Sequence, residues 1–186
     1  TINLQEQLID KDLPLLAKVI DCGFRAVLMK GRANYLCPAR LKRVLADADD
    51  LFEGEDIDEL EMISEWAEQT RDGSLSDLGF EPRAQVWDQV CSERHVCTPK
   101  SCGHDAGCFY QSVRKEVVDA DVVVLNHTLL FTLMAVMDES DSAGEGFVFP
   151  DDFLVIDEAH TLENIAARQL GLRVSQSGIL YNLRRL

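Results

Sequence analysis

Residues 153–160 read Phe153-Leu154-Val155-Ile156-Asp157-Glu158-Ala159-His160, an apolar run that ends in two adjacent carboxylates. The four apolar residues are typical of a strand buried on both faces of a parallel sheet. In open α/β sheets ligands bind at the carboxyl ends of the strands. One carboxylate there can hold Mg²⁺ on a nucleotide's phosphates while the other orients the attacking water. The pattern predicts half of an ATP-hydrolysing site at Asp157 and Glu158, and the alternative is a strand that ends at a solvated acidic turn.

The other half of such a site has no counterpart in the sequence. A phosphate-binding loop needs Gly-x-x-x-x-Gly-Lys-Ser/Thr, so that backbone N–H groups and a lysine face the phosphates. No glycine of this chain is followed by lysine. We therefore expect the chain to be a piece of a larger ATPase and to be inactive on its own.

Two further apolar runs, residues 25–29 and 121–125, predict strands that precede the one at 153–156. Residues 3–20 have helical spacing that Pro14 interrupts, and helical stretches also separate the strands, so the fold class is α/β with a parallel sheet. About ninety residues between the first two strands differ in character, because they hold a cysteine cluster and an acidic block. We predict that these residues form a domain inserted into the sheet.

The charge of the chain is concentrated in the acidic block. The net charge is −15, yet residues 47–88 alone contain fifteen Asp or Glu and only two Arg, a balance of −13. Ile57, Leu60, Ile63 and Ala67 recur there at helical spacing, which predicts an amphipathic surface helix. The block is expected to be a solvated face; a nucleic-acid mimic or a dock for a basic partner is the alternative.

Six cysteines occur in a chain without an apolar run of 18 residues or a basic-then-apolar leader. We therefore expect no membrane partner and a cytoplasmic location, where thiols serve metal or redox chemistry rather than disulfides. Cys97, Cys102 and Cys108 are regularly spaced, and Cys37 is the fourth candidate ligand. Four thiolates select zinc or an iron–sulfur cluster. Zinc usually shows ligand pairs two to four residues apart, so the spacing favours iron–sulfur, with zinc and buried metal-free thiols still open.

The two remaining cysteines are not expected to be primary metal ligands. Cys22 ends an apolar helix and is expected in the core. Cys91 lies six positions before Cys97, so it is either a substitute ligand or a free thiol.

The densest basic run lies beside the first candidate ligand. It comprises Lys30, Arg32, Arg40, Lys42 and Arg43. Such a run is either solvated or, together with Tyr35, able to contact single-stranded DNA through phosphate pairing and base stacking. The DNA-binding candidates are Lys30, Arg32 and Tyr35.

Several separated motifs resemble, in the same order, those of the XPD/DinG family of 5′-to-3′ DNA helicases, and most of all its bacterial DinG-type members. The similar segments are Thr1–Leu8 (motif Ia), Lys30–Cys37 (first cluster cysteine), Cys97, Cys102, Cys108-Phe109-Tyr110, Val124–His127 (the strand that resumes the motor domain) and Asp157–His160 (the Asp-Glu-Ala-His motif II).

The resemblance implies a RecA-like motor domain over residues 1–30 and 115–170, with a mainly helical iron–sulfur domain inserted over 31–114 and an arch domain starting at 171. It implies that Cys37, Cys97, Cys102 and Cys108 hold a [4Fe–4S] cluster. ATP and Mg²⁺ would bind at Asp157, Glu158 and His160. The implied parent is a monomeric ATP-dependent helicase of single-stranded and forked duplex DNA, with a role in DNA repair. The competing hypothesis is a metal-stabilised nucleic-acid-binding or interaction module without ATPase activity.

Overall fold

The protein is described by a computed structural model that covers residues 2–94, 96–102, 107–139 and 153–171. It divides into two compact units, Thr1–Leu125 and Asn126–Leu186, and each is treated by itself. The predicted arch segment 171–186 lies outside the described residues except for Gly171.

The first unit begins with a helix that changes its pitch. Helix α1 (Ile2–Gln7) continues into the π-helical turn η1 (Leu8–Asp12) and then into α2 (Leu13–Val19). Pro14 is the second residue of α2, and because it has no N–H, it removes one hydrogen bond from the ladder just after the π-helical turn. The predicted interruption near Pro14 is confirmed.

A two-stranded parallel sheet follows. Strand β1 (Ala26–Leu28) pairs with β2 (Val122–Val124), and Val27 lies opposite Val123. Parallel neighbours need a long crossover between them, and here the crossover is the whole inserted segment. Both predicted strands are confirmed, each shorter than expected, and the α/β class holds in a helix-rich form.

The strand predicted over 153–156 is wrong. The structure assigns no strand there, Phe153 is fully exposed, and Val155 is 92% exposed. A strand forms only where a neighbour pairs with its backbone N–H and C=O groups, and none of the described residues pairs with this run. The sheet of the described chain is therefore limited to β1 and β2.

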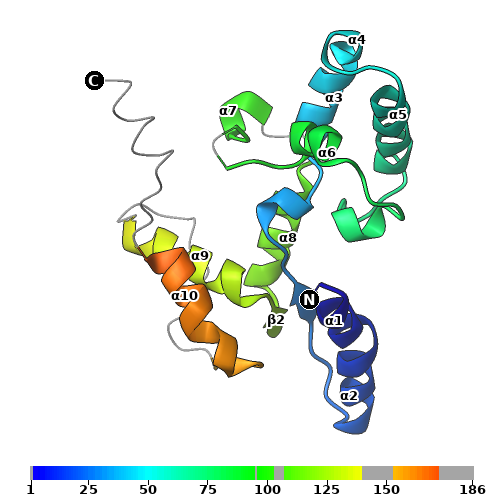
Figure 1. The fold of residues 1–186 in the computed structure, drawn as a ribbon. Coiled ribbons are helices and arrows are strands. Elements are labelled where there is room, and N and C mark those ends of the chain that lie inside the picture. Colours follow the sequence, from blue (N-terminus) through cyan, green and yellow to red (C-terminus); the bar gives the residue numbers. More distant parts are fainter. Residues whose placement is uncertain (1, 95, 103–106, 140–152, 172–186) are drawn as a thin grey trace. The chain divides into compact units, whose positions relative to one another are not determined.

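The inserted segment is mainly helical, as predicted. It contains η2 (Arg32–Asn34), α3 (Pro38–Ala46), α4 (Ala48–Leu51), α5 (Glu55–Ala67), η3 (Leu75–Asp77), α6 (Ala84–Val90), α7 (Pro99–Cys102) and α8 (Phe109–Val118). Helix α3 packs against α5 and α6, and Figure 1 shows α3 to α6 grouped together. Helix α8 returns the chain to β1.

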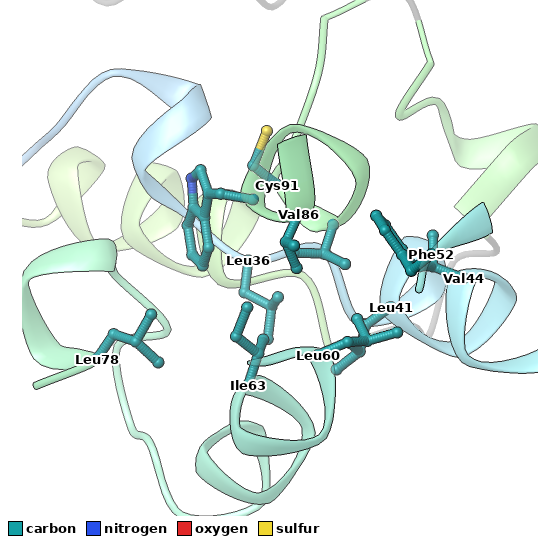
Figure 2. Close-up of a cluster of buried hydrophobic side chains, with 11 residues drawn as sticks. Leu36, Leu41, Val44, Phe52, Leu60, Ile63, Leu78, Val86 and Cys91 are labelled. Atoms are coloured by element: carbon teal, nitrogen blue, oxygen red, sulfur yellow. The ribbon is translucent and has the colours of Figure 1, made fainter. Parts of the chain in front are cut away.

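A hydrophobic cluster holds these helices together (Figure 2). Leu36, Val86 and Val90 are fully buried in it, and α5 contributes Leu60 and Ile63. The predicted amphipathic helix is thus confirmed as α5. Its opposite face carries exposed acids.

One arginine offsets part of that charge. Arg83 pairs with Asp56 at 2.6 Å, with Glu59 at 3.8 Å and closely with Glu55. The three carboxylates lie in the first turns of α5, where the helix dipole also favours negative charge.

The second unit pairs two helices. Helix α9 (His127–Glu139) packs against α10 (Leu162–Leu170), which follows the short turn η4 (Ala159–Thr161) (Figure 1). Among the described helices, none has the length and apolar character needed to cross a membrane.

Among the described glycines of the insertion, Gly73 is the one whose backbone lies closest to another side chain. Its φ is +61°, and a Cβ placed there would lie 2.2 Å from Cγ of Phe109. We predict that Gly73→Ala destabilises the insertion by about 2–4 kcal/mol, from left-handed strain plus overpacking. Both tryptophans of the chain, Trp66 and Trp87, lie in the insertion, so their fluorescence during urea unfolding measures its stability.

The matched control is Gly79→Ala. Gly79 also has a positive φ, +80°, but a Cβ there would meet no atom within 4 Å. Strain alone should cost about 1–2 kcal/mol. Equal losses in the two variants would show that the contact with Phe109 is not limiting.

Candidate functional site

Three of the four predicted ligand thiols converge in the insertion. The Sγ atoms of Cys37, Cys97 and Cys102 all lie within 4.8 Å of one another. Cys37 Sγ is 3.5 Å from Cys97 Sγ and 3.9 Å from Cys102 Sγ. Residues sixty positions apart in sequence thus form one soft-metal ligand set.

Backbone pairing fixes the position of Cys37. Leu36 forms an antiparallel bridge with Cys91, and the N–H of Cys37 donates to the Val90 carbonyl at 2.8 Å. Helix α3 begins at the next residue, Pro38, whose lack of an N–H suits a first helical position. The Cys37 side chain is consequently held at the start of a helix and is buried.

Tight local turns position the other two thiols. The N–H of Cys97 donates to the Glu93 carbonyl at 2.9 Å, and the N–H of Glu93 donates to Cys97 Sγ at 3.3 Å. Thr98 and Ser101 exchange backbone-to-hydroxyl hydrogen bonds across the first turn of α7. Cys102 is the last residue of that helix, so its thiol is carried by a capped turn.

The pKa values of Cys37 and Cys97 are shifted in opposite directions. Burial raises the pKa of Cys37 to about 12, and its hydrogen bond to Cys97 adds to that effect. Burial also raises the pKa of Cys97, but hydrogen bonds from the Glu93 N–H and from Cys37, Ser92 and Cys102 lower it by more. Cys97 therefore loses its proton more readily than Cys37 does, and a metal must displace the proton of Cys37.

The spacing of the sulfur atoms bears on the metal. Thiolates around a tetrahedral zinc at about 2.3 Å lie about 3.8 Å apart, close to the 3.5 and 3.9 Å found here. A four-iron cluster, which is larger than one ion, needs wider spacing. The three thiols are ligands that either centre accepts, but the spacing of their sulfur atoms matches a single zinc ion more closely than a four-iron cluster.

Cys108, the predicted fourth ligand, is not part of the trio. It lies at the N-cap of α8 and is partly exposed. Cys91 is buried in the hydrophobic cluster (Figure 2), and its Sγ faces the Asp88 carbonyl at 3.9 Å. Cys22 is exposed, so its predicted place in the core is wrong.

The second predicted site, the acidic turn, lies in the other unit. Asp157 and Glu158 are both exposed, and Asp157 Oδ1 accepts the N–H of Glu158 at 2.9 Å. Glu158 has left-handed φ and ψ of 49° and 43°, a conformation that is uncommon for a non-glycine residue and clusters at functional sites. His160 Nδ1 lies 3.2 Å from Glu158 Oε2.

The turn is tied to helix α9 through one threonine. Thr161 donates its N–H and its hydroxyl to the Glu158 carbonyl, each at 3.0 Å. Its hydroxyl also lies 3.1 Å from Nδ1 of His127, the first residue of α9. Sequence reasoning did not single out Thr161, which bonds the backbone of Glu158 directly, whereas His127 contacts the Thr161 hydroxyl.

Two of the three predicted DNA contacts are placed inside the protein. Lys30 is 6% exposed, and Tyr35 is 3% exposed. Burial raises the pKa of Tyr35 to about 12, and its hydroxyl oxygen accepts the N–H of Lys30 at 3.0 Å. The prediction of DNA contact is therefore corrected for both residues, because neither presents its charge or ring to solvent.

Arg32 remains a candidate. It is partly exposed, and its guanidinium lies 4.4 Å from the ring centroid of Tyr110. Its Nη1 is 3.4 Å from the Glu93 carbonyl, beside the thiols. The ring holds the face of a guanidinium that stacks on it, while the N–H groups at the edge of the guanidinium can still donate hydrogen bonds.

Comparison with known proteins identifies the family. The DEAD_2 family model matches residues 87–179. The chain belongs to the DEAD_2 family. This half of the chain contains Cys97, Cys102, Cys108 and the acidic turn, whereas Cys37 precedes it.

Curated relatives of this DEAD_2 chain extend the match. It is 34% identical to the ATP-dependent DNA helicase YoaA of Escherichia coli over 95% of its length, and 34% identical to YoaA of Haemophilus influenzae over 91%. It is 32% identical to the ATP-dependent DNA helicase DinG of Photobacterium profundum over 89%. The resemblance to the XPD/DinG family is confirmed. The chain spans about a quarter of the length of these relatives.

Arg40 supports the DEAD_2 thiol site in a way that charge alone did not indicate. Its Nη1 donates to the Cys91 carbonyl at 2.7 Å and to Glu93 Oε2 at 3.1 Å, and its Nη2 donates to the Asp88 carbonyl at 2.7 Å. It thereby holds the segment that leads to Cys97. Its position three residues after Cys37 was the available signal, since residues that orient metal ligands are often their close neighbours.

We predict that Arg40→Gln speeds metal loss to a chelator by about 10–100-fold, the usual effect of removing a partner behind a ligand. The measurement is the rate of metal release at fixed chelator concentration. Arg43→Gln is the matched control, because Arg43 lies on the same helix, is exposed, and bonds only the Ala39 carbonyl of its own helix in the described contacts. Release at the same rate from both variants would contradict a supporting role for Arg40.

Proposed function

We propose that this chain is part of the first motor domain of an ATP-dependent DNA helicase, with a metal-bearing domain inserted between β1 and β2. The observation that carries the proposal is the convergence of Cys37, Cys97 and Cys102 in a chain whose relatives are named ATP-dependent DNA helicases. The whole helicase is the active species, and this chain alone is expected not to hydrolyse ATP.

The proposed metal group is a [4Fe–4S] cluster held by Cys37, Cys97, Cys102 and Cys108. When bound, it supplies a covalent tie among chain segments that a small insertion cannot hold by burial alone. The protein's own part is to deliver the thiolates. Cys97 is deprotonated more readily than Cys37, and the turn at Thr98–Ser101 positions Cys102 beside it.

A single zinc ion is the second candidate for the site. The short sulfur–sulfur distances of 3.5 and 3.9 Å favour zinc, whereas the family resemblance favours an iron–sulfur cluster. If the metal is zinc, the insertion would be a metal-stabilised binding module. The acidic turn would then hydrolyse ATP only together with a phosphate-binding loop supplied from outside this chain.

At the acidic turn, Asp157 is proposed to hold Mg²⁺ on the nucleotide and Glu158 to orient the attacking water, with His160 at the same site. The left-handed Glu158 backbone supports this proposal, because Thr161 holds it with two hydrogen bonds that leave the carboxylate exposed. The proposed partners are single-stranded and forked duplex DNA, bound by a monomer. Arg32 is the proposed DNA contact in this chain.

The decisive test is metal analysis of cysteine variants purified without oxygen. Cys37→Ser, Cys97→Ser, Cys102→Ser and Cys108→Ser should each lose iron and acid-labile sulfide, because each removes one of four ligands. Cys22→Ser and Cys91→Ser are the controls and should keep both. Stoichiometric zinc in a colourless protein would replace the cluster in this proposal, and retention of metal by all four variants would remove the site.

In the full-length helicase, Glu158→Gln should lower DNA-stimulated ATP turnover at least 100-fold while sparing nucleotide binding, because water orientation is lost and Mg²⁺ binding is not. Steady-state ATPase and nucleotide titration measure the two effects. Glu163→Gln is the control, since Glu163 is an exposed carboxylate on the neighbouring helix α10. A loss of turnover of the same size in both variants would argue against a specific role of Glu158.

A further inference from the structure

The ammonium of Lys30 has all three of its hydrogen-bond donors occupied inside the protein. Its Nζ donates to Glu6 Oε1 at 2.8 Å, to Ser74 Oγ at 2.9 Å and to Ser76 Oγ at 2.5 Å. A lysine ammonium has three N–H donors and no acceptor, so this geometry satisfies it fully. The side chain is only 6% exposed.

The three acceptors come from two separate parts of the fold. Glu6 lies on α1, which belongs to the stretch that precedes the sheet. Ser74 and Ser76 lie in the 72–77 turn of the insertion, about seventy residues later in the chain. Lys30 itself follows β1, so one side chain at the end of the strand connects the helix before it to the insertion after it.

The turn that receives Lys30 is itself well ordered by hydrogen bonds. Asp72 accepts the N–H of Ser74 at 2.9 Å and its hydroxyl at 2.7 Å. Ser74 is fully buried and forms an antiparallel bridge with Tyr35, whose hydroxyl accepts the N–H of Lys30. The side chain of Lys30 therefore ends on this turn, and its main-chain N–H ends on Tyr35, the residue that pairs with the turn.

Glu6 completes the pair from the other side. Burial raises the pKa of Glu6, but hydrogen bonds from Lys30 and Ser76 lower it by more, so the carboxylate is charged opposite the ammonium. A buried charge is costly unless it is paired and hydrogen-bonded. Helix α1 cannot separate from the turn without leaving one of these charges uncompensated.

We propose that Lys30 is a positioning residue that fixes helix α1 to the 72–77 turn, so that movement of the motor segment is transmitted to the insertion. It does not contact DNA. The mechanical part of this inference stands on the contacts of Lys30 alone, and only its consequence for unwinding rests on the proposed function.

Hydrogen exchange on the full-length protein tests the link without any activity measurement. Lys30→Met keeps the length of the side chain and removes its charge and donors. Amide exchange in residues 2–7 and 72–78 should accelerate at least tenfold in this variant. Glu6→Gln, at a partly exposed position, should produce a smaller rise in the same two segments. Lys42→Met, at an exposed lysine of α3, is the control and should leave both unchanged.

A paired ATPase and fork-unwinding assay on the same preparations tests the consequence. Lys30→Met should keep single-strand-stimulated ATPase within twofold and lower the base pairs opened per ATP at least fivefold. Unchanged exchange in both segments would overturn the link. Equal loss of ATPase and unwinding, or salt-dependent loss of single-strand binding without faster exchange, would also overturn it, in favour of a general structural role or a DNA contact. A wild-type protein without helicase activity would instead remove the proposed function and leave the exchange test standing.

Discussion

The insertion depends on one extended segment, Tyr35–Cys37, whose backbone is paired on both sides. Leu36 donates to Gly73 at 2.9 Å, Cys37 donates to Val90 at 2.8 Å, and Tyr35 accepts from Ser92 at 2.7 Å. Each of the three side chains then serves a different part of the fold. Tyr35 bonds Lys30, Leu36 is fully buried in the hydrophobic cluster, and Cys37 joins the thiols. The hydrophobic cluster, the hydrogen bond to Lys30 and the candidate metal site therefore share one segment of backbone.

This arrangement explains why a metal is useful here. The hydrophobic cluster draws on α3, α5 and α6 but, among the described residues, on none of 97–102. These six residues are held by a short hydrogen-bonded turn and by the thiols rather than by apolar burial. Metal binding by cysteines couples directly to folding, so ligation would stabilise the part of the insertion that the core does not reach.

The sequence showed which residues could carry chemistry, but it did not show whether those residues are buried or what they contact. Cysteine spacing identified Cys97 and Cys102 together with Cys108, and Cys37 was named as the fourth candidate; the structure brings Cys37, Cys97 and Cys102 together without Cys108. Lys30 and Tyr35 were misjudged because a basic run reveals charge but not burial, and Lys30 is neutralised by a carboxylate 24 positions away. The strand at 153–156 was overpredicted because apolar character shows that a strand can be buried, not that a neighbour is present to pair with it. Cys22 was misplaced for a related reason, since an apolar helix face can also lie open in the described unit.

Cys108, the proposed fourth ligand, would link the proposed metal site to Arg32, the remaining candidate for DNA contact. Cys108 directly precedes α8, and Tyr110 lies two residues later in its first turn. The Tyr110 ring lies 5.9 Å from that of Tyr35 and beneath the guanidinium of Arg32. A ligand bond at Cys108 would therefore fix the first turn of α8 and, through Tyr110, the position of Arg32. Because an arginine stacked on a ring is oriented by that ring, metal binding through Cys108 would be coupled to the orientation of Arg32 by the same turn of helix.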